Sequence, residues 1–362
     1  MKRIKIDRGT RLGLIAGAVI VAMIISLIVR AILSVGVFNS FPEQFAGACK
    51  IVPGMKGPED LEVDAPDNLI FVSAFNRRAP GSSPDPQDGI YTLKLDDTSA
   101  PPVKLAGTPK DFHPHGISLY RSAPDALTLF VINHRASGKQ TIETFDVKVA
   151  NGAATLTETG ILESRLLVSP NDIYAFGPQQ FYVTNDHTST TPLGRWIDDY
   201  PQFPRANLVV YNGQEFKVAV ERLNFPNGVL MAPDGKHVYV TSTTKRELLV
   251  FEREPFTGQL KQVDGLSIPA RLDNVSMDAS GNLWIAGHPK LPAYVGYPTD
   301  PSKPSPSVVF RVVMLNGVPQ SYETVYANNG EQIAASSSAA AYKNHLFVGS
   351  VYDNKILDCT TN

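Results

Sequence analysis

Several features that mark other protein classes are missing from this chain of 362 residues. Its 33 Lys and Arg nearly balance 35 Asp and Glu, and no basic stripe is present, which argues against a nucleic-acid partner. No low-complexity tract occurs, and helical periodicity is almost absent beyond residue 38. The 28 prolines and 27 glycines are instead spread between short apolar runs. This distribution is typical of many short strands joined by turns.

Cysteine is also scarce, because the chain contains only Cys49 and Cys359. They stand near the two ends of the sequence that follows the first 40 residues. In an oxidising compartment, a pair placed in this way indicates one disulfide that ties the ends of a closed structure together. A metal held by the two thiols is the weaker alternative, since no C-x-x-C spacing supports it.

The one long hydrophobic run lies at the N-terminus. Residues 12–29 carry no charge, and residues 1–11 contain five Lys or Arg against one Asp. A run of 18 residues is long enough to cross a bilayer, and the basic flank would keep the first residues cytoplasmic. The sequence therefore predicts a single-pass type II membrane protein of the secretory pathway. Its parts are a cytoplasmic tail (1–11), a transmembrane signal anchor (12–38) and a lumenal or extracellular domain (39–362).

A cleaved signal peptide is the alternative interpretation of this run. The apolar region of such a peptide usually has about 7 to 15 residues, fewer than are found here. The A-x-A sequence from Ala46 to Ala48 also lies well beyond the run. An uncleaved anchor is therefore favoured.

The rest of the chain repeats one pattern: a polar pair, an alternating apolar strand, a Gly or Asn turn and a second apolar strand. The first four starts are each 56 residues apart, and the fifth follows after 46. Units of this size have room for four short strands, so the pattern predicts an all-β, six-bladed β-propeller. A β-sandwich is the alternative, but it explains neither the period nor the terminal cysteines. The six starts are Glu59, His115, Asn171, Asn227, Asp273 and about Ser337.

The polar residues at these starts form one constellation if the fold is a propeller, because the first strand of each blade lines the central channel. Carboxylates and amides without cysteine offer the oxygen ligands that Ca²⁺ prefers, whereas Zn²⁺ favours nitrogen and sulfur. At any single blade, Asp and Asn could simply cap a turn. Recurrence in five blades favours a metal site instead. The residues are Glu59, Asp60, His115, Asn171, Asp172, Asn227, Asp273 and Asn274.

With these motifs identified, the sequence resembles the paraoxonase/arylesterase family of calcium-dependent esterases and lactonases, from about Cys49 to Cys359. The matching stretches include GPEDLEV, FHPHGISLY, VINH, SPNDIYAFGPQQFYVTNDH, FPNGVLMAPDGKHVYV and VGSVYDNKILDC. The resemblance implies a six-bladed propeller with two Ca²⁺, which would hydrolyse lactones and aryl esters. A small-molecule substrate and an uncleaved hydrophobic N-terminus that contacts a membrane follow from the same resemblance.

The family's functional residues can be carried over position by position. The resemblance implies a histidine dyad, His115 and His134, with His115 as the base, and the disulfide Cys49–Cys359. Phe225 and Val351 match positions that line the family's substrate pocket. The catalytic Ca²⁺ would be bound by Glu59, Asn171, Asn227, Asp273 and Asn274, and the structural Ca²⁺ by Asp60, Asp172 and the backbone carbonyl of Ile117.

The chain departs from the family pattern at three places. His113 stands where the family motif has no histidine, and we interpret it as a wall or turn residue. The loop of residues 74–81 is one residue longer than its counterpart, and residues 187–200 form a differently composed loop. These departures leave the substrate open. Two other functions also stay open: a membrane-tethered binding propeller that uses calcium structurally, and a metal-free propeller of the strictosidine-synthase-like kind.

Overall fold

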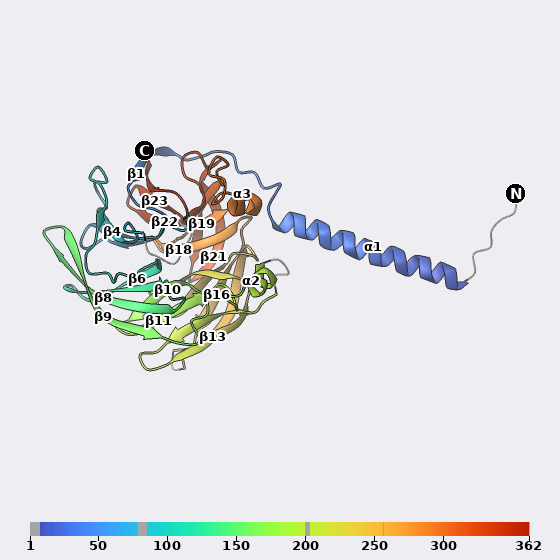
Figure 1. Cartoon of the computed structure of the whole chain (residues 1–362), viewed down its shortest axis with the longest axis horizontal. Coiled ribbons are helices and arrows are strands. Elements are labelled where there is room, and N and C mark those ends of the chain that lie inside the picture. The colour runs from blue at the N-terminus through green and yellow to red at the C-terminus, as the bar shows by residue number, and fades with distance from the viewer. Residues whose placement is uncertain (1–7, 79–84, 200–202, 256, 362) are drawn as a thin grey trace.

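In the described part of the computed structural model, twenty-four strands form six antiparallel sheets of four strands each. The structure describes residues 8–78, 85–199, 203–255 and 257–361. Each sheet is one blade, and the inner strand of each blade contacts the inner strand of the next, while β22 contacts β2 and closes the ring (Figure 1). The predicted six-bladed propeller is therefore confirmed.

In five blades the strands follow chain order from the inner to the outer edge. Blade 1 contains β2 (Pro58–Asp64), β3 (Leu69–Ala74), β4 (Gly89–Lys94) and β5 (Val103–Lys104). Blade 2 contains β6 (Pro114–Ala123), β7 (Ala126–His134), β8 (Gln140–Ala150) and β9 (Ala153–Glu163). Blade 3 contains β10 (Pro170–Gly177), β11 (Gln180–Asn185), β12 (Ala206–Tyr211) and β13 (Phe216–Leu223). Blade 4 contains β14 (Pro226–Met231), β15 (His237–Ser242), β16 (Glu247–Arg253) and β17 (Leu260–Ser267). Blade 5 contains β18 (Arg271–Met277), β19 (Leu283–His288), β20 (Ser307–Leu315) and β21 (Val318–Asn328).

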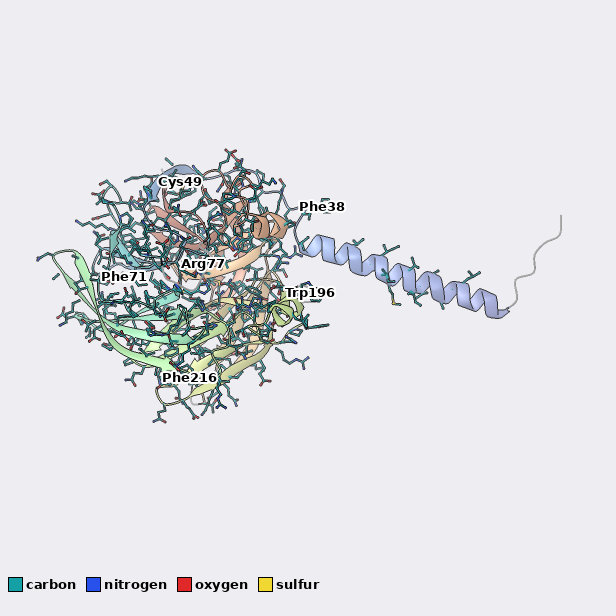
Figure 2. All side chains as sticks on the ribbon, in the orientation of Figure 1. Phe38, Cys49, Phe71, Arg77, Trp196 and Phe216 are labelled. Carbon is teal, nitrogen blue, oxygen red and sulfur yellow. A yellow bond between two sulfur atoms is a disulfide. The ribbon has the colours of Figure 1, made fainter. Side chains whose placement is uncertain are left out.

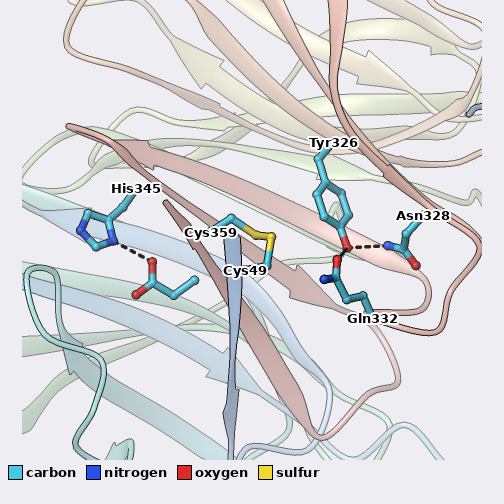
Figure 3. The surroundings of a disulfide bond; sticks show 7 residues. Cys49, Tyr326, Asn328, Gln332, His345 and Cys359 are labelled. Atoms are coloured by element: carbon cyan, nitrogen blue, oxygen red, sulfur yellow. Dashed lines mark hydrogen bonds and ion pairs between the residues drawn. A yellow bond between two sulfur atoms is a disulfide. The ribbon is translucent and has the colours of Figure 1, made fainter. Parts of the chain in front are cut away.

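Blade 6 combines the two ends of the propeller sequence. It contains β22 (Ser336–Tyr342), β23 (His345–Ser350) and β24 (Lys355–Thr361), and its outer strand is β1 (Gly47–Pro53). Cys49 and Cys359 stand opposite each other in the β1–β24 register and form a disulfide, which confirms the predicted bond (Figure 3). Beside the disulfide, Nδ1 of His345 is hydrogen-bonded to Oδ1 of Asp358 at 2.7 Å. The disulfide therefore closes the ring covalently.

The apolar core lies between neighbouring blades rather than along the axis. Phe130 of blade 2 and Phe181 of blade 3, for example, are both fully buried, and their ring centroids are 5.6 Å apart. Near the axis the inner strands approach so closely that a side chain does not fit at two glycines. A Cβ atom at Gly116 would lie 2.6 Å from the Cα atom of Asp172, and one at Gly228 would lie 2.7 Å from the backbone nitrogen of Val275. Glycine at these positions allows β6 to pack on β10 and β14 to pack on β18.

Three helices lie outside the blades in the described part of the chain. Helix α1 (Arg8–Ser34) extends away from the propeller (Figure 1). Within the described residues, no helix combines the length and the apolar character that a membrane crossing requires. The predicted anchor is therefore not confirmed, and residues 1–7 of the predicted tail lie outside the described residues.

Two short helices were not expected from the sequence. Helix α2 (Pro192–Asp199) lies within the stretch 187–200 that we expected to be a loop, and α3 (Leu291–Gly296) connects β19 to β20. Each has only one or two turns, which is too short for an apolar period to appear in the sequence. Residues 79–81 and 200 of the two departing loops lie outside the described residues.

Candidate active site

The predicted metal ligands and His115 lie at the start of the inner strands, where the pairing with the second strand is irregular. In β10 the register shifts between Pro170 and Ile173, so Asn171 and Asp172 stand in a bulge. The same shift occurs at the corresponding place in all six inner strands. Bulges redirect side chains, and they are frequent beside active sites. This geometry allows two consecutive side chains of one strand to serve the centre of the ring.

Five buried side chains from four blades make up the first group of oxygen atoms. The side-chain oxygen Oδ1 of Asn171, Asn227 and Asn274 is buried without a hydrogen-bond partner, and so is Oε2 of Glu59. The amide nitrogens of two of these residues are used, because Asn274 donates to Glu59 Oε1 at 2.9 Å and Asn171 donates to Asp186 at 3.3 Å. These four side-chain oxygens therefore have no hydrogen-bond donor. Buried oxygens without donors are costly unless a cation binds them, so this set fits a hard metal ion.

The charges of this group repel one another in the described structure. Burial holds the pKa of Glu59 well above its usual range, the Arg77 guanidinium lowers it, and the nearby charge of Asp273 raises it further. Asp273 in turn shares a contact of 2.8 Å with His288 Nε2. Across the described residues, no three His, Cys, Asp or Glu side chains are grouped as a metal site. The set found here differs from such a group because three of its five members are amides.

The second group consists of Asp60 and Asp172. Asp60 accepts backbone N–H bonds from Leu61 at 2.8 Å and from Ile117 at 2.7 Å, and Asp172 accepts them from Ile173 at 2.8 Å and from Val229 at 2.7 Å. Each carboxylate therefore ties its own strand to the inner strand of the next blade along the ring. Burial raises the pKa of Asp60 to about 6. Burial, followed by the charge of Asp60, holds the pKa of Asp172 well above its usual range. Two buried carboxylates that repel each other also fit a cation.

The two predicted dyad histidines contact each other directly. Nδ1 of His115 lies 2.8 Å from Nε2 of His134, and Nδ1 of His134 is hydrogen-bonded to Oε1 of Gln140. Burial, the charge of Arg77 and the neighbouring His134 hold the pKa of His115 well below its usual range. Burial lowers the pKa of His134 to about 4, although the bond to Gln140 raises it. Both rings are therefore neutral at pH 7.

His113 lies beside the dyad rather than on the surface. It is buried, its Nδ1 lies 2.7 Å from the carbonyl oxygen of His134, and its ring stacks on Phe75 with a centroid distance of 4.7 Å. Its carbonyl also accepts the backbone N–H of His134. His113 thus fixes the backbone of His134 through hydrogen bonds. The prediction had assigned it only to a wall or turn.

The two predicted pocket residues belong to different blades, Phe225 to blade 4 and Val351 to blade 6. Phe225 precedes β14, and its ring packs against His187 at a centroid distance of 4.8 Å. Val351 follows β23 and is buried. His187 is hydrogen-bonded to Asp186 at 2.7 Å and to Asp199 of α2 at 3.1 Å. Phe225 therefore stands against the segment that departs from the family pattern.

Three hydroxyl groups support the backbone of site residues, and one of them, Ser337, was named from the sequence only as a repeat start. Each donates to the backbone carbonyl of a site residue in the next blade along the ring. For the other two a signal was present, because Thr184 and Thr241 hold the same position in the similar stretches FYVTN and VYVTS. The pairs are Thr184 with Asn227, Thr241 with Asp273, and Ser337 with Glu59, each at 2.6 Å.

With this geometry described, the chain was compared with known proteins. A model of the arylesterase family matches residues 45–360. The chain belongs to the arylesterase family. The predicted resemblance is therefore confirmed, and this arylesterase is an enzyme of the esterase and lactonase class.

Curated relatives agree over most of their length. Serum paraoxonase/arylesterase 2 of Rattus norvegicus is 33% identical over 317 residues, which covers 85% of this arylesterase and 87% of the relative. Serum paraoxonase/arylesterase 1 of Homo sapiens is 31% identical over 325 residues, with coverages of 86% and 88%. The range matched by the family model, residues 45–360, includes strands of every blade.

Solved structures share the fold at much lower identity. A luciferin-regenerating enzyme superposes with a TM-score of 0.53 at 12% identity, covering 87% of this arylesterase and 95% of that chain. A calcium-binding regucalcin from Agrobacterium tumefaciens gives a TM-score of 0.52 at 14% identity, with coverages of 89% and 97%. At such identities the likeness concerns the propeller fold alone.

Proposed function

We infer that this arylesterase hydrolyses lactones and aryl esters at the centre of the ring, and that it binds calcium there. The observation that carries the inference is the set of four buried oxygens without partners, which lies beside a neutral histidine pair. The first ion would be held by Glu59, Asn171, Asn227, Asp273 and Asn274, and the second by Asp60, Asp172 and the carbonyl of Ile117. Calcium bound by the first set would stabilise the negative charge that develops on the carbonyl oxygen of the substrate.

The hydrogen-bond chain of the dyad determines which nitrogen of His115 can act as a base. Oε1 of Gln140 only accepts, so Nδ1 of His134 must carry the proton and Nε2 of His134 must accept. Nδ1 of His115 is then the donor in the 2.8 Å contact between the rings. This tautomer leaves Nε2 of His115 as a free acceptor, 3.6 Å from Oε2 of Glu59. We propose that it removes a proton from the attacking water.

Calcium is favoured over other metals by the chemistry of the donor atoms. All proposed side-chain ligands are carboxylates or amides, and neither cysteine is available, because both are in the disulfide. The calcium-binding regucalcin with the same fold supports this choice. The number of ions, two, follows from the presence of two separate groups of buried oxygens.

For the placement of the chain, we propose a tail (1–11), an anchor (12–38) and a lumenal or extracellular catalytic propeller (39–362). The uncharged run of residues 12–29 and its basic flank support the anchor. The disulfide supports an oxidising compartment. A binding propeller without catalysis would share this topology, but it would not need a free histidine acceptor beside the oxygen set.

A panel of lactones and aryl esters, assayed with full-length protein, tests the function. We expect turnover of at least one class, loss of turnover in EGTA and recovery on addition of Ca²⁺ but not Mg²⁺. Metal analysis of each sample is the control. Undiminished turnover in protein shown to contain no calcium would contradict the metal assignment, and absence of turnover by calcium-loaded protein would favour the binding propeller.

A further inference from the structure

Arg78 fixes the loop that follows β3. Its Nη1 donates to the carbonyl of Tyr297 at 2.9 Å, and its Nε donates to the carbonyl of Tyr352 at 3.1 Å. Its guanidinium also lies over the ring of Tyr297, 4.2 Å from the centroid. These contacts tie the loop of blade 1 to the segments after α3 in blade 5 and after β23 in blade 6. The neighbouring residue, Arg77, is therefore held in one place.

Arg77 lies among the proposed reacting groups. Its side chain is only 15% exposed, and its Nη2 atom is buried without a hydrogen-bond partner. The nearest carboxylate oxygen in the described structure is Oε2 of Glu59, at 3.8 Å, which is too far for a hydrogen bond. Its charge acts on the pKa of Glu59 and of both dyad histidines. In Figure 2 it lies toward the middle of the propeller.

The charge of Arg77 has no counterpart once the proposed metals are present. Four carboxylates of the site (Glu59, Asp60, Asp172 and Asp273) neutralise two divalent cations. Burial would lower the pKa of His187, but its bonds to Asp186 and Asp199 raise it to about 9, so this neighbouring imidazolium is already bound to two carboxylates. Arg77 thus adds a positive charge and an unused donor to a proposed site whose own carboxylates and cations balance.

We propose that Arg77 is a substrate-binding residue that selects lactones or esters carrying a carboxylate group close to the scissile bond. The proposal rests on the function proposed above and names its substrate class. A guanidinium presents its donors in a planar fork that matches a carboxylate. Such a group would supply the acceptor that Nη2 lacks and the negative charge that the site lacks. A neutral substrate would leave both unmet.

Two isosteric lactones test this specificity: 5-oxotetrahydrofuran-2-carboxylate and its carboxamide. We expect kcat/KM of the calcium-loaded, full-length enzyme to favour the carboxylate by at least about tenfold, the usual effect of one charge-assisted hydrogen bond. In Arg77→Met this ratio should fall to about one or below, and in Arg77→Lys it should be intermediate. Lys303→Met is the matched control, because it removes one positive charge from a side chain that is 82% exposed, and its ratio should equal that of the wild type.

Binding of compounds that cannot be hydrolysed separates this proposal from the proposed function. Calorimetry should show tighter binding of tetrahydrofuran-2-carboxylate than of tetrahydrofuran-2-carboxamide to the wild type, and no difference in Arg77→Met. Equal binding and equal kcat/KM for carboxylate and amide would overturn the role of Arg77 while leaving ester hydrolysis intact. Selective carboxylate binding without any turnover would support Arg77 and contradict the proposed reaction. A preference that persists in Arg77→Met would also overturn the proposal.

Discussion

The side-chain oxygen of Gln140 determines the tautomers of both His134 and His115, although Gln140 contacts only His134. The chain Gln140, His134 and His115 places a lone pair on Nε2 of His115. A neutral base of this kind contributes about 10² to 10⁴ in rate. The proposed catalytic role of His115 can therefore be tested separately from any role of the metal.

We expect His115→Gln to lower kcat for the preferred lactone by about 10² to 10⁴ while the calcium content stays unchanged, since the ring is not among the proposed ligands. Stopped-flow or steady-state assays with metal analysis would measure both quantities. His237→Gln, at the first residue of β15, serves as a control for the loss of a histidine. Full activity of His115→Gln toward every substrate would show that His115 only forms part of the wall.

The two oxygen groups should respond differently to substitution. Oδ1 of Asn227 has no partner within the protein, so Asn227→Ala should abolish hydrolysis with little change in melting temperature. Asp60→Ala leaves the N–H groups of Leu61 and Ile117 unpaired, which should cost about 2–5 kcal/mol of stability. Scanning calorimetry at saturating calcium would measure both. An unchanged melting temperature in Asp60→Ala would contradict the structural role of the second group. Normal turnover in Asn227→Ala would contradict the role of the first group in hydrolysis.

At the scale of elements, α2 is attached to the propeller partly by one charged histidine. Burial would lower the pKa of His187, but the hydrogen bonds to Asp186 and Asp199 raise it to about 9. The folded-state pKa lies above the unfolded value, so the stabilisation is complete below about pH 6.5 and is lost as the pH rises through about 9.

The wild type should therefore lose on the order of 1–2 kcal/mol of stability between pH 7 and pH 10, after allowance for solvent screening at Asp199, whose side chain is 39% exposed. In His187→Gln this component should be absent, and the difference between the two proteins should shrink as the pH rises. Urea unfolding at a series of pH values measures it. Parallel pH profiles of the two proteins would show that the histidine is not charged in the folded state.

The sequence predicted the elements that repeat and missed those that occur once. The blades could be predicted because the 56-residue spacing fixes the same polar start in four units. Helix α2 could not, since two turns leave no readable period. The place of Arg77 could not be predicted either, because contacts of its neighbour Arg78 with blades 5 and 6 determine it. A position that depends on contacts among three segments distant in the sequence leaves no recognisable pattern in any one of them.

At the scale of the whole molecule, one covalent bond joins the first and last strands of the propeller. The disulfide closes a segment with a sequence separation of 310 residues. Chain-entropy treatments assign roughly 6 kcal/mol to a loop of this length, which is an upper limit. Cys49→Ser and Cys359→Ser should each lose up to this amount, and the double variant should lose no more than either single variant. Guanidinium unfolding measures the loss, and equal stability of all four proteins would contradict it.

The pairing of β1 with β24 also determines when blade 6 can form during synthesis of the protein. Strand β1 leaves the ribosome early, but its partner β24 ends at Thr361, and the disulfide between the two strands spans a sequence separation of 310 residues. At about 5–20 residues per second, the first edge waits roughly 15–60 s for the last one. Blades 1 to 5 can each assemble while β24 is still being synthesised, whereas blade 6 forms only after β24 has left the ribosome. Until then an unpaired strand is exposed at each end of an open ring, and both edges are available to chaperones or to other nascent chains.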